Sequence, residues 1–291
     1  HEVHVGHPRI FIKDYTYNGT VYNNKDEVRN RIISDPQLMQ YMQDAVDIAN
    51  DNYGTTITDI GGHNGSEPPA QPLVMACGLV YQLGEMPGIN YYGRTPLQYG
   101  EDGVRHFDSL LAGDYRNYEH KEYMGLPLGY DWLYELMTDA RRDEIAAILL
   151  RNSDIQDETI RPYNNSPGAR FLGAIAIKGD GYNDAEAESN IEKFYNGITF
   201  GDPIDSAWYT YQWVTLDKRQ MHYAHIFTPE GPNVEGMPYW DYTFPIYPLL
   251  EAWYDQTGED YFKMPFSQSF PYHLAYATGN KNEFQGKQTK D

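Results

Sequence analysis

Residues 227–253 read FTPEGPNVEGMPYWDYTFPIYPLLEAW, a Pro/Gly-rich segment that runs directly into an apolar one. The first part has the composition of a turn-forming loop, and the second predicts a helix over residues 237–254. Such a helix places Tyr239 and Tyr242, three residues apart, on one face near its N-terminal end. We expect these phenol rings to border a substrate cleft. The alternative is core packing, in a chain that holds 27 tyrosines.

Helical spacing of apolar residues recurs through the rest of the chain, and almost no segment alternates strictly enough to predict a strand. Thr138 is the candidate N-cap of one predicted helix, and residues 15–24 are expected to form a loop. The other predicted helical segments are, in chain order, 25–52 with a break at Pro36, 72–84, 97–112, 126–137, 139–151, 168–177, 185–198 and 207–225. The sequence therefore predicts an all-α fold: an extended entry over 1–24, a helical domain over 25–264 and a tail over 265–291.

Composition narrows the class of protein. The 291 residues include 42 acidic and 22 basic side chains, a net charge of −20, which disfavours binding to nucleic acid or an anionic membrane. No apolar run is long enough to predict a transmembrane helix. The single cysteine, Cys77, lies among apolar neighbours and is predicted to be a core residue. The many tyrosines are typical of proteins that handle carbohydrate, because tyrosine offers a flat apolar surface with a hydroxyl group.

Three polar sites are candidates for chemistry. Asp131, beside Trp132, is either a catalytic acid or a structural carboxylate, at the start of a helix or as a partner for a buried donor. Asn164 and Asn165 precede a predicted helix, where amide and backbone donors together could face an anion. The alternative is that Asn165 or Ser166 only caps that helix. A third candidate is His222 with His225, but these two histidines have no third ligand at a suitable spacing, so we predict no metal site.

The order of four segments resembles the helical domain of the heparinase II/III-like polysaccharide lyases, a superfamily that includes alginate lyases. These segments are His7-Pro8-Arg9-Ile10-Phe11, residues 128–138 around Tyr130-Asp131-Trp132, Asn164-Asn165 before a small-residue helix, and the loop from Pro229 to Tyr242. The resemblance covers nearly the whole chain and implies an incomplete α/α toroid. The β-sandwich that follows the toroid in this family has no counterpart in these residues, so we expect it to be absent or to be a separate or truncated domain. The histidine that many relatives place after the toroid asparagine is also missing, because Asn165 and Ser166 follow Asn164.

The resemblance further implies cleavage of a uronic-acid-containing polysaccharide by β-elimination, without a cofactor. Removal of the C5 proton requires stabilisation of the charge that develops on the uronate carboxylate. We expect Asn165 to supply it, supported by Asn164 and Arg170. Tyr242 is the expected base and acid, with Tyr239 as the alternative.

Four further residues complete the expected site. His225 or His222 would tune the tyrosine, and Trp240 and Glu235 are expected at the substrate cleft, Glu235 as a brace of its loop. The expected partner is an acidic polysaccharide or oligosaccharide, and the expected location is secreted or periplasmic.

Two other functions fit the same residues. A glycoside hydrolase on an α/α toroid would need two carboxylates across the scissile bond, and the candidates are Asp131, Glu230, Glu235 and Asp241. A non-catalytic glycan-binding domain would need neither a complete catalytic set nor a β-sandwich.

Overall fold

The structure of the chain is a computed structural model. It describes residues 6–12, 14–17, 20–56, 70–112, 125–151, 166–196, 251–254, 257–258 and 260. The chain divides into two compact units, one of His1–Ile191 with Glu251–Gly258 and one of Glu192–Leu250 with Glu259–Asp291. Almost all of the described residues belong to the first unit.

The N-terminal part of this unit is a hairpin followed by two helices. Strands β1 (Asp14–Tyr17) and β2 (Thr20–Asn23) pair antiparallel, with Tyr15 opposite Tyr22. Helix α1 (Asn24–Ser34) follows at once, and α2 (Pro36–Asp51) begins after Asp35, whose carboxylate accepts hydrogen bonds from the first-turn N–H groups. Proline is favoured in the first turn of a helix, so the predicted break at Pro36 is confirmed.

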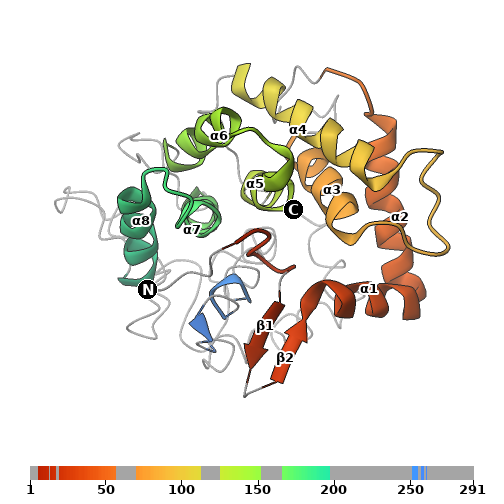
Figure 1. Cartoon of the computed structure of the whole chain (residues 1–291), viewed down its shortest axis with the longest axis horizontal. Helices are drawn as coiled ribbons and strands as arrows, with labels where there is room; N and C mark the ends of the chain where they lie inside the picture. The colour runs from red at the N-terminus through yellow and green to blue at the C-terminus, as the bar shows by residue number, and fades with distance from the viewer. Residues whose placement is uncertain are drawn as a thin grey trace, which may run out of the picture. The chain divides into compact units, whose positions relative to one another are not determined.

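Helices α3 (Ala70–Leu83), α4 (Pro96–Ala112) and α5 (Gly125–Leu133) pack against one another in the core. Figure 1 shows α5 beside α3, with α4 along the same side of the unit. Close approach depends on small residues, because a Cβ at Gly103 of α4 would lie 2.6 Å from the Cβ of Cys77 on α3. Cys77 is fully buried, as predicted for a core residue.

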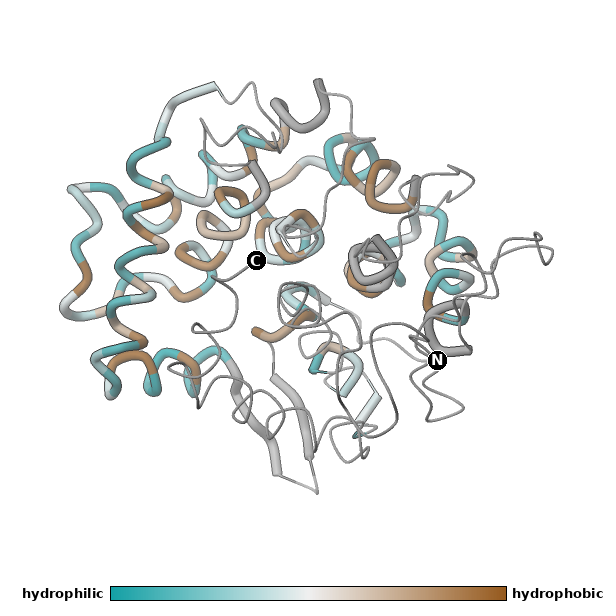
Figure 2. Tube along the Cα trace, turned by 180° about the vertical axis from the view of Figure 1, so that it is seen from behind, coloured by the Kyte–Doolittle hydropathy of each residue, from teal (hydrophilic) through white to brown (hydrophobic). Residues whose placement is uncertain are grey.

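The chain then continues through a short 3-10 turn, η2 (Tyr134–Leu136), and helices α6 (Asp139–Arg151), α7 (Ser166–Ile177) and α8 (Asp184–Asn196). Thr138 caps α6 as predicted, because its hydroxyl accepts from the N–H of Arg141. Helix α7 packs on α5 and α6. Figure 2 shows hydrophobic and hydrophilic residues interspersed along several helices, the pattern expected where one face of a helix is buried, whereas every residue of α5 is buried.

The described part of the chain is thus predominantly helical, which agrees with the predicted all-α class. The prediction of a loop over residues 15–24 was wrong, because β1 and β2 form a hairpin there. The sequence contains the reason: Asn18-Gly19, a strong signal for a tight hairpin turn, lies between two segments rich in tyrosine and β-branched residues. The arrangement of helical hairpins into a toroid remains a prediction.

Candidate functional site

A buried carboxylate on α5 holds the N-terminal segment Gly6–Ile12 in place. Asp131 has no exposed surface, and its two oxygens each lie 2.9 Å from the backbone N of Arg9. The N–H of Ile10 donates to the same carboxylate over 2.8 Å, and the indole of Trp132 donates to the Ile10 carbonyl over 3.0 Å. A buried carboxylate is stable only when donors surround it, and here the backbone supplies them. Asp131 is therefore a partner for buried donors, the structural alternative that its sequence context left open.

His7 lies between two carboxylates. Its Nδ1 is 2.6 Å from Oδ1 of Asp131, and its Nε2 is 3.0 Å from Oδ1 of Asp180. The same Nε2 is 2.8 Å from a guanidinium nitrogen of Arg9, so the proton arrangement at Nε2 depends on the protonation state of the ring. The imidazole side chain is only 4% exposed. His7 thus links the N-terminal segment to α5 and to the turn after α7.

Arg9 makes the second link to that turn. Its guanidinium donates to Asp180 over 2.6 Å and also to the backbone carbonyls of Ile175 and Lys178. A cation at this position stabilises the C-terminal end of α7, where carbonyl groups have no partner within the helix. The ion pair is buried, with side chains 1% and 6% exposed.

The ionisation of Asp180 follows from these contacts. Burial alone would raise the pKa of this carboxyl, but the hydrogen bond from His7 and the charge of Arg9 outweigh burial and hold the pKa below its ordinary value. Tyr130 donates to the second oxygen of Asp180 over 2.9 Å. Burial, and then the negative charge of Asp180, raise the pKa of the Tyr130 hydroxyl well above its ordinary range. The carboxylate therefore stays charged and the phenol stays protonated, so neither is suited to proton transfer near neutral pH.

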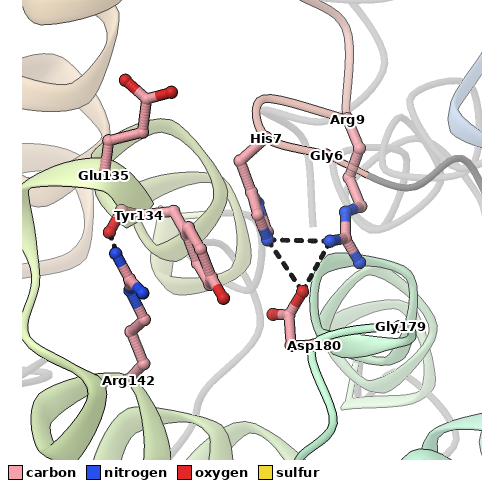
Figure 3. Close-up of a pocket in the computed structure, with 8 residues that line it drawn as sticks. All are labelled: Gly6, His7, Arg9, Tyr134, Glu135, Arg142, Gly179 and Asp180. Atoms are coloured by element: carbon pink, nitrogen blue, oxygen red, sulfur yellow. Dashed lines mark hydrogen bonds and ion pairs between the residues drawn. The ribbon is translucent and has the colours of Figure 1, made fainter.

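We refer to His7, Arg9, Asp131 and Asp180 as the N-terminal clamp. A pocket of about 450 Å³ opens beside it. The pocket is lined by Gly6, His7, Arg9, Tyr134, Glu135, Arg142, Gly179 and Asp180, shown together in Figure 3.

Tyr134 is fixed on both sides of its ring. The imidazole of His7 stacks on it with ring centroids 3.6 Å apart and planes 13° from parallel. The guanidinium carbon of Arg142 lies 4.0 Å from the ring centroid, and Figure 3 shows the ring between these two side chains. Stacking on one face and a cation–π contact on the other leave the hydroxyl edge of the ring to face the pocket.

A second buried polar cluster ties α4 to the end of α2. Asp102 accepts hydrogen bonds from His106 over 3.0 Å, from Arg105 over 2.9 Å and from the N–H of Gly54 over 3.2 Å. Burial opposes its ionisation, but the contacts from His106 and Arg105 lower its pKa overall. These hydrogen bonds connect α4 to the residues that follow α2, so this cluster is a structural brace.

The structure does not test the predicted catalytic and binding site, whose side chains lie outside the described residues. Arg170 lies on α7, but its side chain is outside the described part. The remaining predicted site residues also lie outside it: Asn164, Asn165, His222, His225, Glu235, Tyr239, Trp240 and Tyr242.

The pocket includes residues that follow the C-terminal end of α7, whereas the predicted amide residues precede this helix in the sequence. Asn165 immediately precedes the first residue of α7, whereas Asp180 follows its last residue, Ile177, by three positions. Twelve helical residues span about 18 Å at ~1.5 Å per residue. The turn that carries Gly179 and Asp180 therefore lies about one helix length from Ser166, the first residue of α7.

Sequence reasoning missed the role of His7, Asp180, Tyr134 and Arg142. The segments that contain His7 and Tyr134 carry part of the resemblance, but no pattern within them indicates a pocket. Asp180 follows the small-residue helix within a Gly-rich turn, and nothing in that turn indicates a partner in the N-terminal segment. The site becomes visible only through the contacts of His7 with Asp131 and Asp180, which are more than 120 positions away in the sequence.

No group of His, Cys, Asp and Glu side chains in the described ranges gathers as a metal site. Over the same ranges, no helix combines the length and apolar character that crossing a membrane requires.

Comparison with known proteins adds no assignment. No family model matches this chain, and no curated protein matches it. The resemblance to the heparinase II/III-like lyases stays a prediction that depends on the quoted segments and their order.

Proposed function

We propose that this chain is the helical domain of a polysaccharide lyase that cleaves a uronic-acid-containing polymer by β-elimination. One observation in particular supports the proposal. Two of the segments that carry the resemblance, residues 7–11 and 128–134, are held together by Asp131 through three hydrogen bonds to the backbone of Arg9 and Ile10. Chance similarity in two short segments gives no reason for them to share a buried contact, whereas a common scaffold does.

The state of Asp131 also bears on the hydrolase alternative. A glycosidase acid must reach the leaving-group oxygen, but this carboxylate is fully buried and saturated by donors. The hydrolase would have to use Glu230, Glu235 or Asp241 instead. The lyase proposal needs no pair of carboxylates.

The proposed chemistry divides the work between amides and a phenol. Asn165, with Asn164 and Arg170, donates to the uronate carboxylate and stabilises the enolate-like charge when the C5 proton leaves. Tyr242 removes that proton and returns one to the leaving oxygen, with Tyr239 as its alternative and with His225 or His222 lowering its pKa. Trp240 and Glu235 shape the cleft. The substrate is an acidic polysaccharide or oligosaccharide, and the proposed location is secreted or periplasmic.

The test is an ultraviolet assay of the purified chain against heparin, heparan sulfate, chondroitin, hyaluronan, alginate and ulvan. A lyase product carries a conjugated double bond and absorbs, whereas a hydrolase product does not. With the active polymer, Tyr242→Phe should abolish turnover and leave binding nearly unchanged, and Asn165→Ala should lower the rate by about 10²-fold or more.

Tyr41→Phe, an exposed position on α2, is the matched control and should retain full activity. Wild-type turnover in Tyr242→Phe would remove this residue from the mechanism. Saturable binding of a polymer without any cleavage would replace the lyase by a glycan-binding domain.

A further inference from the structure

The pocket beside the N-terminal clamp has hydrogen-bonding capacity left after its internal contacts are counted. Arg142 carries five N–H donors, of which one is given to the carbonyl of Tyr134 and one to Asp139. Three donors of this guanidinium therefore have no partner within the described structure. The hydroxyl of Tyr134 likewise has none there, and Figure 3 shows it directed into the space between Arg142 and Asp180.

Acceptors line the same pocket. Asp180 accepts from His7 and Arg9 at one oxygen and from Tyr130 at the other, which uses three of roughly four lone-pair positions of a carboxylate. Glu135 adds an exposed carboxylate at the rim. Hydrogen-bond donors and acceptors therefore line one pocket. Such a wall suits a ligand whose groups both donate and accept hydrogen bonds.

The charges of the described residues on the pocket wall balance. Arg9 and Arg142 are positive, Glu135 and Asp180 are negative, and His7 is shared between Asp180 and the buried Asp131. Two cations against two carboxylates leave no excess that would attract an anion or a cation strongly. Among the described residues of the wall, Tyr134 alone offers an apolar ring, and both faces of this ring are already covered. A hydrophobic ligand and a strongly charged one are both poor fits.

The wall is held in place before any ligand arrives. The clamp fixes Asp180 and His7, and the stack of His7, Tyr134 and Arg142 fixes the phenol. Burial, and then the charge of Asp180, raise the pKa of Tyr134, so its hydroxyl remains a donor through the physiological range. A preorganised polar site loses little conformational entropy on binding.

From these observations we propose that the pocket beside the N-terminal clamp binds a neutral sugar unit through its hydroxyl groups. Sugar hydroxyls donate and accept, carry no charge and match the mixed set presented by Tyr134, Arg142 and Asp180. The volume of about 450 Å³ lies within the usual range for small-molecule sites. The site is a binding site only, and it stands independently of the lyase proposal.

The test measures binding without turnover. Glucose, galactose, mannose and N-acetylglucosamine are titrated into the whole chain by calorimetry or ligand-observed NMR, with glucuronate and inorganic phosphate as charged comparisons. We expect at least one neutral sugar to bind in the millimolar range and more tightly than either charged probe. Tyr134→Phe, which keeps the stacked ring and removes one hydroxyl, should weaken binding roughly 3- to 10-fold, the effect of one lost hydrogen bond.

Tyr41→Phe is again the matched control and should bind as the wild type does. A melting curve for Tyr134→Phe that matches the wild type shows that the loss is local. The proposal is overturned if no neutral sugar binds, if glucuronate or phosphate binds more tightly, or if the two Tyr→Phe variants bind equally. None of these outcomes depends on cleavage of any polymer, so the lyase proposal stands or fails separately.

Discussion

In the first unit, the ionisation of a buried side chain depends on a few neighbouring residues, and Asp180 is the clearest case. Its carboxylate is charged in a largely buried position because His7, Arg9 and Tyr130 all direct hydrogen bonds to it. The net charge of the chain is −20, so its other charges do not on average attract a further carboxylate. The local hydrogen-bond donors must therefore stabilise the buried charge of Asp180. The ionisation of Asp180 is thus coupled to the fold of the N-terminal segment.

This coupling predicts a loss of stability in acid. A carboxyl whose pKa is lower in the folded protein contributes its full stability above its unfolded pKa of about 3.9 and loses it as the pH falls toward the folded value. The stability advantage of the wild type over Asp180→Asn should therefore be constant from about pH 7 to about pH 5 and should shrink from about pH 4 to about pH 3. Urea unfolding of both proteins at each pH measures the difference and cancels the other carboxyls, including Asp102. A difference that does not change with pH would show that Asp180 is not held ionised by the clamp.

At the scale of elements, the junction of α3, α4 and α5 depends on close helix contact. The missing side chain of Gly103 lets α4 approach α3 and α5, because an added Cβ would lie 2.6 Å from Cβ of Cys77 and 2.9 Å from Cδ1 of Leu133. We predict that Gly103→Ala lowers the free energy of unfolding by about 1–3 kcal/mol through overpacking, despite the better helix propensity of alanine. Gly173→Ala on α7 is the control, since its Cβ would lie 3.4 Å from that of Leu149, and it should leave stability unchanged or raise it. Chemical denaturation compares the two, and equal stabilities would mean that the helices can shift to accept the methyl group.

Helices could be predicted from the sequence where neighbouring residues mark their ends. The bounds of α6 match the prediction because Thr138 caps the helix and an apolar period follows directly. The break before α2 was predicted for a similar reason, a proline in a first helical turn. The hairpin of β1 and β2 was missed although Asn18-Gly19 marks it, because its two short strands lack a strict alternation of apolar and polar residues.

The clamp could not be predicted, because its four side chains come from three separate segments. The pairing of His7 with Asp131 and Asp180 spans 124 and 173 positions, and no spacing rule connects such residues. The helical class could be predicted from periodicity alone, whereas the pocket exists only after α5 and α7 have packed together.

For the first unit as a whole, the N-terminal clamp makes residues 6–12 a strap between α5 and the end of α7. We predict that Asp131→Asn releases this strap, because an amide places N–H donors where the carboxylate accepts from Arg9, Ile10 and His7. Loss of a buried, charge-assisted network of this kind costs roughly 3 kcal/mol or more. Hydrogen exchange should show faster exchange in residues 9–12 and at the C-terminal end of α7, while α2, which receives none of the hydrogen bonds described for the clamp, keeps its protection.

The control is Asp143→Asn, an exposed position on α6, which should change stability by less than about 0.5 kcal/mol and leave the exchange pattern unaltered. If Asp131→Asn instead accelerates exchange uniformly in α2 and α7, the unit opens only as a whole and the strap has no local role. If neither helix changes, the backbone contacts of Asp131 are dispensable. The two segments that carry the lyase resemblance would then touch without depending on each other, and the proposed function would lose the contact that supports it.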